Sequence, residues 1–328
     1  MPVLRRCRLA LMLGLVLLSA ANTAHAQGTF PERPIRLVVA FTPGGATDVV
    51  ARQIANDLKD AIGQPVVVEN RPGANGQIAW THVASSDPDG YTLLMAENAL
   101  AISQGLYKHI AFDPIRQLDA VCLVATAPLV LVTSNKVKAN TLAEFVAMSK
   151  TIPGEYNFSS AGIGSVAHLV FEVFMAGAGM EAVHVPYKGG GQAIGDVVAG
   201  HIDAVMSAIS VARGLIEQGQ VKALAVTSPE RSPALPNVPT LRESGVTTAD
   251  VDLRFWWGIF GPAGMPQAVK AKLSGAVAAA LASPQLRERL AKLDIDPTFA
   301  TAPALQAKLA NEIANWTRFI DEHGIKVE

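Results

Sequence analysis

Cysteine is scarce in this chain of 328 residues, which contains only two. Cys7 lies near the N-terminus, and Cys122 lies in the apolar run Val121–Val124. If the N-terminal segment is removed, one cysteine remains and an intramolecular disulfide is excluded. The apolar surroundings favour a small core side chain at Cys122 over a nucleophile. The seven histidines form no cluster with cysteine or with one another, so the pattern gives no support for a metal site.

Long apolar runs and an excess of basic charge are also missing. After residues 9–18, no segment reaches the roughly 18 uninterrupted apolar residues that a membrane span needs. The chain has 27 basic and 28 acidic residues, a balance that argues against nucleic acid as a partner. It contains no low-complexity tract, heptad array or short repeat, which argues against an extended scaffold.

The first 26 residues have the pattern of a secretory leader. Three arginines at positions 5, 6 and 8 precede the apolar run Leu9–Leu18, and Ala24-His25-Ala26 fits the site of signal peptidase. We expect cleavage between Ala26 and Gln27 and a periplasmic protein without a lipid anchor, since no cysteine follows the cleavage site. Cleavage removes three basic residues and no acidic one, which leaves 302 residues with a net charge of −4.

Short apolar runs alternate with amphipathic segments along most of the mature chain. This pattern is typical of an α/β fold in which helices cover both faces of a parallel sheet. The sequence predicts strands over residues 35–40, 66–69, 91–95, 120–124, 129–133, 156–159, 183–185, 204–207, 221–226 and 251–257. It predicts helices that begin near residues 46, 77, 142, 165, 192, 266, 283 and 303.

The length predicts two lobes, at roughly 100 to 200 residues each. We place the first part of lobe one at residues 27–124, lobe two at 125–228 and the second part of lobe one at 229–328. Two chain crossings would form a hinge, which lets two lobes close over a ligand through small rotations of loop segments.

Each predicted lobe has a glycine-rich turn between a strand and a helix. Pro43-Gly44-Gly45 precedes a helix at Ala46, and Ser159–Ser165 contains Gly162 and Gly164 before the next helix. Backbone N–H groups at a helix start bind anions. Because the chain is exported, we expect a captured carboxylate rather than a nucleotide phosphate, with facing loops on the two ends of a dicarboxylate. Two ordinary strand-to-helix turns are the alternative.

Two enzyme-like motifs overlap the second turn. Gly162–Ala167 fits the dinucleotide fingerprint G-x-G-x-x-A, but Glu181 precedes the next strand, whereas the ribose-binding acid belongs at its end. Ser165 and His168 are three residues apart on one helix face, which suggests a hydrolase, but a nucleophile elbow needs glycine where Ala167 stands. Ser165 is interpreted as a helix cap with its hydroxyl also available to a ligand.

Further polar residues follow predicted strands. Thr47 and Asp48 lie in a first helical turn, where an acid is favoured by the helix dipole alone, and Thr47 is expected to donate to a ligand carboxylate. Tyr187 is expected to line a cleft, Lys188 to supply positive charge, and Gly189 to allow close approach of the backbone. Asp203 is a further candidate, with a turn cap as the alternative.

The order of these blocks resembles the Bug proteins, the substrate-binding receptors of tripartite tricarboxylate transport systems. The resemblance runs over essentially the whole mature chain. It rests on blocks at residues 34–39, 43–48, 51–52, 63–70, 71–74, 88–93, 161–165, 168–169, 185–190, 258, 262–264 and 266.

This resemblance implies a type II periplasmic-binding-protein fold, two doubly wound lobes that close on a carboxylate, with no catalysis and no cofactor. It assigns ligand contacts to Phe41, Gly45, Ala46, Thr47, Asp48, Gly164, Ser165, Tyr187, Lys188 and Gly189. The chain departs from the family at Ala96–Ala99, where small hydroxyl residues are common. We therefore expect Asn98 to recognise the identity of the ligand. Glu97 beside an anion site is unfavourable unless it points away, so an amide, amino or aromatic acid is the alternative to a conventional dicarboxylate.

The sequence as a whole predicts a monomeric periplasmic receptor that captures a small carboxylate ligand and hands it to a membrane permease of the tripartite type. An exported serine hydrolase that uses Ser165 and His168 is the alternative from another class. An orphan receptor that acts in sensing, without a permease, is the third.

Overall fold

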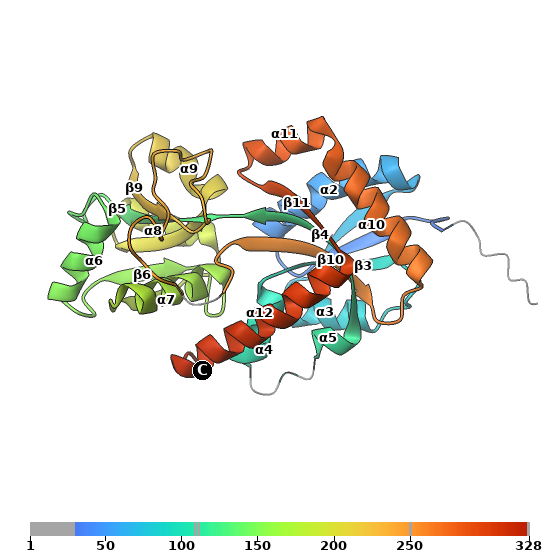
Figure 1. Cartoon of the computed structure of the whole chain (residues 1–328), viewed down its shortest axis with the longest axis horizontal. Helices are drawn as coiled ribbons and strands as arrows, with labels where there is room; N and C mark the ends of the chain where they lie inside the picture. The colour runs from blue at the N-terminus through green and yellow to red at the C-terminus, as the bar shows by residue number, and fades with distance from the viewer. Residues whose placement is uncertain (1–29, 108–109, 111, 249–250, 327–328) are drawn as a thin grey trace, which may run out of the picture.

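The computed structural model describes residues 30–107, 110, 112–248 and 251–326. The expected leader and its cleavage site lie outside the described residues. Two lobes lie side by side along the long axis of the molecule, each built around one sheet (Figure 1). Within the described ranges, no helix has both the length and the apolar character that a membrane crossing requires.

Lobe one contains a sheet of six strands in the order β11-β4-β10-β3-β1-β2. The strands β1, β2 and β3 pair in parallel, whereas β10 is antiparallel to β3 and β4, and β11 is antiparallel to β4. The expectation of a parallel sheet therefore holds for only part of it. The bounds are β1 Ile35–Val39, β2 Val66–Asn70, β3 Thr92–Glu97, β4 Leu118–Ala127, β10 Phe255–Pro262 and β11 Asp296–Thr301.

Lobe two contains five strands in the order β7-β6-β8-β5-β9. The strand β6 runs parallel to β7 and to the central strand β8, and β5 is antiparallel to β8 and β9. The carboxyl ends of β6 and β7 therefore point the same way. The bounds are β5 Leu129–Ser134, β6 Asn157–Ser160, β7 Val183–Pro186, β8 Ala204–Ala208 and β9 Val221–Val226.

Helices cover both faces of each sheet (Figure 1). In β1, Leu37 and Val39 belong to a cluster with Val50 and Ile54 of α2, and Val38 belongs to a cluster with α3 on the other face. This alternation follows from the two-residue period of a strand. The helices are α2 Ala46–Ile62, α3 Gln77–Ala84, α4 Ala99–Leu106, α5 Pro114–Gln117, α6 Leu142–Thr151, α7 Val166–Ala178, α8 Gly190–Ala199, α9 Ile209–Glu217, α10 Gln267–Ala282, α11 Pro284–Lys292 and α12 Ala302–Glu322, with the 3₁₀ turn η2 at Ala74–Gly76.

Several local predictions are confirmed. Gly63 ends α2 in the left-handed conformation with φ of 78°, as expected of a C-terminal glycine. Thr141 caps α6 by accepting a hydrogen bond from the N–H of Glu144. Cys122 is fully buried, and burial raises the pKa of its thiol to about 12. A thiol that stays protonated is inert, so the interpretation of Cys122 as a core residue is confirmed.

Other predictions need correction. The strand expected at residues 251–257 begins at Phe255 and continues to Pro262, because its central residues pair with both β3 and β4. The sequence does not predict the strand β11 or the helices α4, α5 and α9.

The chain passes between the two sheets twice. Only Pro128 separates β4 from β5, and residues 227–254 lead from β9 back to β10. The two crossings are tied together, because the N–H of Leu129 donates to Thr227 Oγ1 and the N–H of Thr227 donates to the carbonyl of Leu129, both at 2.9 Å. These bonds place the two connections side by side.

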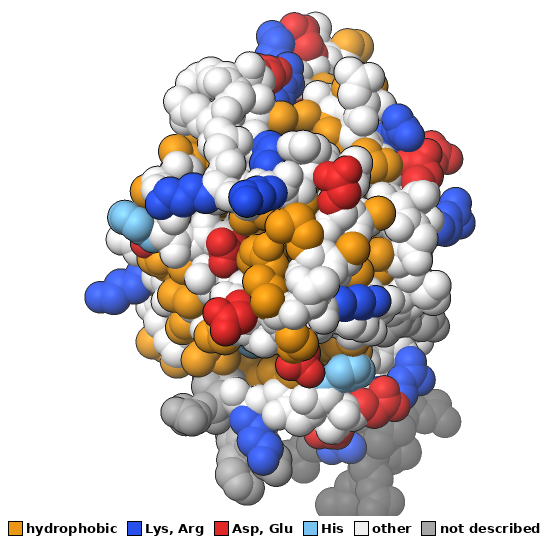
Figure 2. All heavy atoms as spheres, turned by 90° about the vertical axis from the view of Figure 1, so that its left-hand side faces the viewer, with side chains coloured by type: hydrophobic (Ala, Val, Ile, Leu, Met, Phe, Trp, Pro, Cys, Tyr) orange, Lys and Arg blue, Asp and Glu red, His pale blue; other side chains and the backbone are white. Residues whose placement is uncertain are grey.

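The outer end of lobe two has a mixed surface. Lys and Arg side chains alternate there with Asp and Glu side chains, around a strip of hydrophobic side chains (Figure 2). No basic field of the kind that nucleic acid requires covers this face, in agreement with the balanced charge of the chain.

Candidate functional site

The N-terminus of α2 presents free backbone donors at the carboxyl end of β1. Gly45 is the N-cap and makes no side-chain cap, and the first helical bond joins the N–H of Val49 to its carbonyl at 3.0 Å. The N–H groups of Ala46, Thr47 and Asp48 have no hydrogen-bond partner among the described residues. With the positive end of the helix dipole, these donors favour an anion.

The side chain of Asp48 fixes the loop that leads into α2. It is 2% exposed and accepts hydrogen bonds at 2.9 Å from the N–H of Gly44, from Arg52 Nε and from Asn70 Nδ2. The Asn70 amide also donates to the carbonyl of Phe41 at 3.0 Å. Burial raises the pKa of Asp48, but the bonds from Arg52, Gly44 and Asn70 outweigh it and lower that pKa. Asp48 therefore stays ionised and shapes the backbone of the predicted grip.

Glu97 joins the same helix end from β3. Thr47 Oγ1 donates to Glu97 Oε2 and accepts a hydrogen bond from Trp257 Nε1 at 3.1 Å. Burial raises the pKa of Glu97 to about 7, and the bond from Thr47 offsets this only in part. The hydroxyl that was expected to donate to a ligand carboxylate thus donates to a carboxylate of the protein.

The glycine turn of lobe two is held by serine and histidine side chains. Ser165 caps α7 by accepting from the backbone N–H of His168 at 3.3 Å, and the N–H of Gly164 donates to His168 Nδ1 at 3.2 Å. Ser160 Oγ contacts both His184 Nε2 at 2.7 Å and the backbone of Gly162. The N–H groups of Val166 and Ala167 in the first turn of α7 have no partner among the described residues.

This arrangement does not form a hydrolytic triad. Glu172 Oε1 lies 3.5 Å from His168 Nε2, so an acid stands beside the imidazole. The other ring nitrogen already accepts from the N–H of Gly164, and Ser165 Oγ contacts the backbone of His168 rather than its ring. A general base must bond to the hydroxyl that it activates, and no such bond is present among these residues.

The next turn along the chain adjoins this loop. The N–H of Tyr187 donates to the carbonyl of Ser160 at 3.0 Å, and a Cβ built on Gly162 would lie 3.3 Å from the Tyr187 carbonyl oxygen. The Tyr187 hydroxyl donates to Asp196, which raises its pKa, so only the ring is free to line a site. Gly189 starts α8 without a side-chain cap, next to the exposed Lys188.

The two sets of loops meet between the lobes. A Cβ built on Gly164 of lobe two would lie 2.4 Å from Leu106 Cδ2 and 3.6 Å from Asn75 Nδ2, both in lobe one. Asn75 Nδ2 is buried and has no hydrogen-bond partner among the described residues. The glycine turn after β6 therefore lies against the end of α4 and the turn η2, which follows β2 in lobe one.

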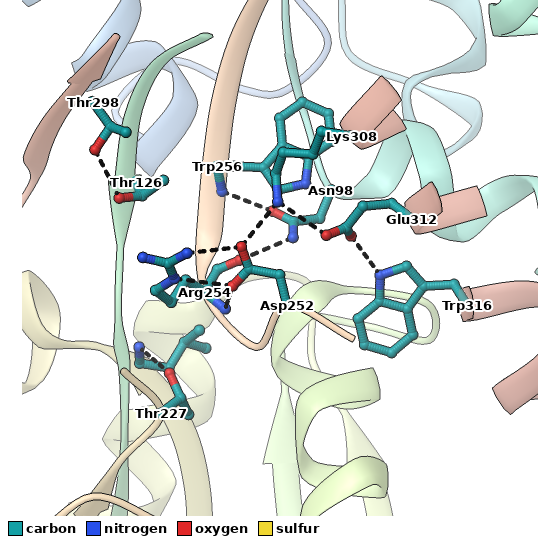
Figure 3. Close-up of polar contacts among 11 residues, drawn as sticks. Asn98, Thr126, Thr227, Asp252, Arg254, Trp256, Thr298, Lys308, Glu312 and Trp316 are labelled. Atoms are coloured by element: carbon teal, nitrogen blue, oxygen red, sulfur yellow. Dashed lines mark hydrogen bonds and ion pairs between the residues drawn. The ribbon is translucent and has the colours of Figure 1, made fainter. Parts of the chain in front are cut away.

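The Asn98 side chain bonds to the backbone that leads into β10 and not to these loops. It is fully buried, its Nδ2 donates to the carbonyl of Arg254 at 2.9 Å, and its Oδ1 accepts from the N–H of Trp256 at 3.0 Å. Figure 3 shows it beside a polar cluster where Asp252 contacts Arg254 and Lys308, at the entry of the chain into β10.

Asp203 lies at the opposite end of lobe two from the glycine turns. It precedes β8, and its carboxylate accepts from the N–H of Asn157, the first residue of β6, at 2.9 Å. The N–H of Asp203 in turn donates to Asn157 Oδ1 at 2.9 Å. This reciprocal pair joins the starts of two parallel strands, whereas the predicted ligand loops follow their carboxyl ends.

Sequence reasoning missed Arg52, Asn70 and Trp257 at this site, and it did not predict the contact that Glu97 makes with Thr47. Arg52 follows Asp48 by one helical turn, so its role could have been found from the spacing. Asn70 ends β2 and Glu97 ends β3, where polar residues of α/β folds converge. Trp257 had no signal, because it is 210 residues away from the hydroxyl that it contacts.

Comparisons with known proteins show the family to which the chain belongs. The model of the family described as "Tripartite tricarboxylate transporter family receptor" matches residues 50–325. Protein BugT of Bordetella pertussis is 36% identical over 324 residues, which cover 98% of this chain and 99% of BugT.

Two solved structures are similar over nearly their whole length. The periplasmic binding protein BugD has a TM-score of 0.80 and 32% identity, over 91% of this chain and 100% of BugD. A protein of R. palustris solved with adipate has a TM-score of 0.82 and 30% identity, over 90% of this chain and 99% of that one. The α/β fold of two lobes is confirmed. The chain belongs to the tripartite tricarboxylate transporter receptor family, whose members are solute-binding receptors of the periplasm and not enzymes.

Proposed function

We propose that this receptor captures a small carboxylate between its two lobes. The observation that carries this proposal is the uncapped N-terminus of α2, which offers the N–H groups of Ala46, Thr47 and Asp48 at the carboxyl end of β1. Backbone donors at a helix start match carboxylate oxygens without requiring a charged side chain. The similar protein solved with adipate supports the same ligand class.

Lobe two supplies the second half of the grip. The free N–H groups at the start of α7 and the uncapped start of α8 give donors, Ser165 adds a hydroxyl, and Lys188 adds positive charge. Phe41 and the ring of Tyr187 would line the space between the two sets of donors. A ligand held from both sides favours the closed form, because it contacts both lobes only when they are together.

The route of the ligand follows from the family. We infer that the leader is removed between Ala26 and Gln27, that the mature receptor acts as a monomer in the periplasm, and that it delivers its ligand to a membrane permease of the tripartite type. No cofactor is needed for this capture, because it requires only binding of the ligand and closure of the lobes.

A thermal-shift screen of residues 27–328 tests the proposal. The panel contains dicarboxylates, tricarboxylates, amino acids and aromatic acids, and a ligand that prefers the native state raises Tm. We expect a saturable shift with a carboxylate and recovery of the ligand unchanged. Loss of the ligand to hydrolysis, or no shift with any carboxylate, would refute the receptor proposal for this class.

Two substitutions locate the grip. Gly45 has φ of −74°, and its built Cβ would lie 3.5 Å from the nearest atom, the Thr42 carbonyl oxygen, so Gly45→Ala fits the fold. We expect Gly45→Ala and Ser165→Ala to weaken carboxylate binding at unchanged Tm of the free protein. Gly195→Ala, an exposed position with no atom within 4 Å, is the matched control. Wild-type affinity in both site variants would contradict the proposed contacts.

A further inference from the structure

Glu97 places a carboxylate of the protein at the helix end that is proposed to hold the ligand carboxylate. Its Oε2 accepts from Thr47 Oγ1, and Thr47 belongs to the first turn of α2, whose N–H groups are free. The inference below rests on the proposed function, since it concerns the ligand of the same site.

The electrostatics of this arrangement are unfavourable for a simple dicarboxylate. Two unit charges about 4 Å apart repel by about 4 kcal/mol at an effective dielectric constant of about 20. No Lys, Arg or His side chain among the described residues forms an ion pair with Glu97, and its second oxygen, Oε1, makes no hydrogen bond with them. The nearby Arg52 is engaged by Asp48.

Burial also disfavours the ionised form of Glu97. The residue is half-buried at the end of β3, and burial raises its pKa to about 7 with only the Thr47 bond in opposition. A bound cation would reverse this effect, since an opposite charge within about 4–6 Å favours the ionised carboxylate. Oε1 of Glu97 is thus free to bind a partner, and a positively charged partner would stabilise the ionised form of this carboxylate.

We propose that Glu97 binds the ammonium group of an amino carboxylate, whose carboxylate is held by the N-terminus of α2. Thr47 provides the geometric reason, because its N–H belongs to the carboxylate subsite and its hydroxyl contacts Glu97. The two subsites are therefore one residue apart, which matches the adjacent ammonium and carboxylate of an α-amino acid. The remainder of the ligand points toward Ser165 and Lys188 of lobe two.

Isothermal calorimetry with matched pairs of ligands tests this assignment on residues 27–328. The pairs are aspartate and succinate, glutamate and glutarate, and phenylalanine and 3-phenylpropionate, whose members differ in the amino group. We expect the wild-type receptor to prefer the amino member of the pair that it binds by at least about tenfold, the range of a hydrogen bond to a charged group.

The variant Glu97→Gln keeps the size of the side chain and removes its charge. We expect it to lose most of that preference, with a fall of at least about tenfold for the amino member and little loss for its partner. Glu181→Gln makes the same change at an exposed site before β7 and should behave like wild type. An unchanged preference in Glu97→Gln would overturn the assignment.

The pH dependence of wild-type binding gives a second measurement that needs no variant. If Glu97 binds an ammonium, affinity for the amino member rises between pH 6 and 8, because the carboxyl must lose its proton. If protonated Glu97 instead donates to a carboxylate, the des-amino member binds tighter and its affinity falls over this range. The charged neighbours on α2, Asp48 and Arg52, have pKa values shifted away from this window.

The outcomes separate this inference from the function on which it rests. Tighter binding of des-amino members by the wild type refutes the ammonium site and leaves the carboxylate receptor intact. No binding of any carboxylate, with or without an amino group, refutes both.

Discussion

Asp48 and Arg52 form a two-fold contact one turn apart in α2, with Arg52 Nε 2.9 Å from Asp48 Oδ2 and Arg52 Nη2 2.9 Å from Asp48 Oδ1. The same carboxylate accepts from the N–H of Gly44. The acid in this first turn therefore does more than complement the helix dipole. Asp48 accepts the hydrogen bond of the Gly44 N–H group, whereas the N–H groups of Ala46 and Thr47 stay free for a ligand.

Asp48→Ala should destabilise the receptor and loosen its carboxylate grip. The change leaves the N–H of Gly44 without its acceptor and removes one of the two acceptors of the Asn70 amide, at a cost of about 1–3 kcal/mol in the free energy of unfolding. Urea unfolding at pH 7 measures this, with Asp60→Ala on the exposed face of α2 as control.

The pH dependence of that difference has a defined sign. The pKa of Asp48 is lowered in the native state, so its contribution is present above the unfolded value of about 3.8 and is lost as pH falls through the folded pKa. Equal stability of wild type and Asp48→Ala at pH 7 would show that the contacts of Asp48 contribute nothing.

Gly164→Ala should oppose closure of the lobes. Gly164 has φ of +77°, and a Cβ there would lie 2.4 Å from Leu106 Cδ2 across the lobe boundary. We expect ligand affinity to fall by about tenfold or more, and X-ray scattering to show less compaction on addition of ligand. Gly154→Ala has a similar φ of +74° with no atom within 4 Å, so it imposes the backbone strain alone.

Removal of the facing side chain separates strain from steric contact. In Gly164→Ala with Leu106→Ala, the collision is relieved while the strained φ remains, and part of the lost affinity should return. Equal losses in Gly164→Ala and Gly154→Ala would contradict a role for the lobe contact.

Elements with strong local signals could be predicted from the sequence, and those that depend on distant pairing could not. The unit from β1 to α2 has an apolar strand, a glycine turn and a helical stripe, and all three are present. The strand β10 contains Gly258, Gly261 and Pro262, which resemble turn residues, but pairing on both edges overrides this preference. Short strand β11 includes Pro297 and lies at the sheet edge, where proline is tolerated.

In the predicted site, too, residues with local sequence signals could be placed and residues that depend on distant contacts could not. The glycine turns and the residues within one helical turn of them could be placed from local spacing, including Thr47 and Ser165. The side-chain directions of Glu97 and Asn98 could not, because adjacent residues at the end of a strand face different neighbours. Glu97 bonds to α2, whereas Asn98 bonds to the backbone that leads into β10. The hydrogen bonds of Asn98 thus join it to backbone groups of the protein, whereas the sequence alone predicts a ligand contact for it.

His184 should make the receptor sensitive to acid. Its ring stacks on His168 with centroids 3.9 Å apart and contacts Ser160 Oγ at 2.7 Å. Burial, and next the charge of His168, lower the pKa of His184 to about 3. Because the unfolded chain takes up the proton near pH 6.5, stability falls as pH drops from there toward 3, by up to about 1.4 kcal/mol for each pH unit.

Urea midpoints at pH 7 and pH 5 measure this effect. His184→Gln removes the titration and keeps a polar partner for Ser160, so its loss of stability between these pH values should be smaller than that of wild type. His201→Gln, at an exposed imidazole, should follow wild type. Parallel curves for wild type and His184→Gln would show that another group causes the acid sensitivity.

Asn98→Ala should cost stability without changing which ligand is preferred. The substitution removes the acceptor for the N–H of Trp256 and the donor to the carbonyl of Arg254. The Asn98 side chain that makes these two bonds is fully buried. Two backbone groups left unpaired cost about 1–3 kcal/mol each. Denaturant unfolding measures this loss, and calorimetry with two carboxylates gives the ratio of their affinities. Asn135→Ala removes one exposed bond, to the carbonyl of Gly219, and serves as control. A changed ratio at unchanged stability would instead assign Asn98 to the ligand, as the sequence predicted.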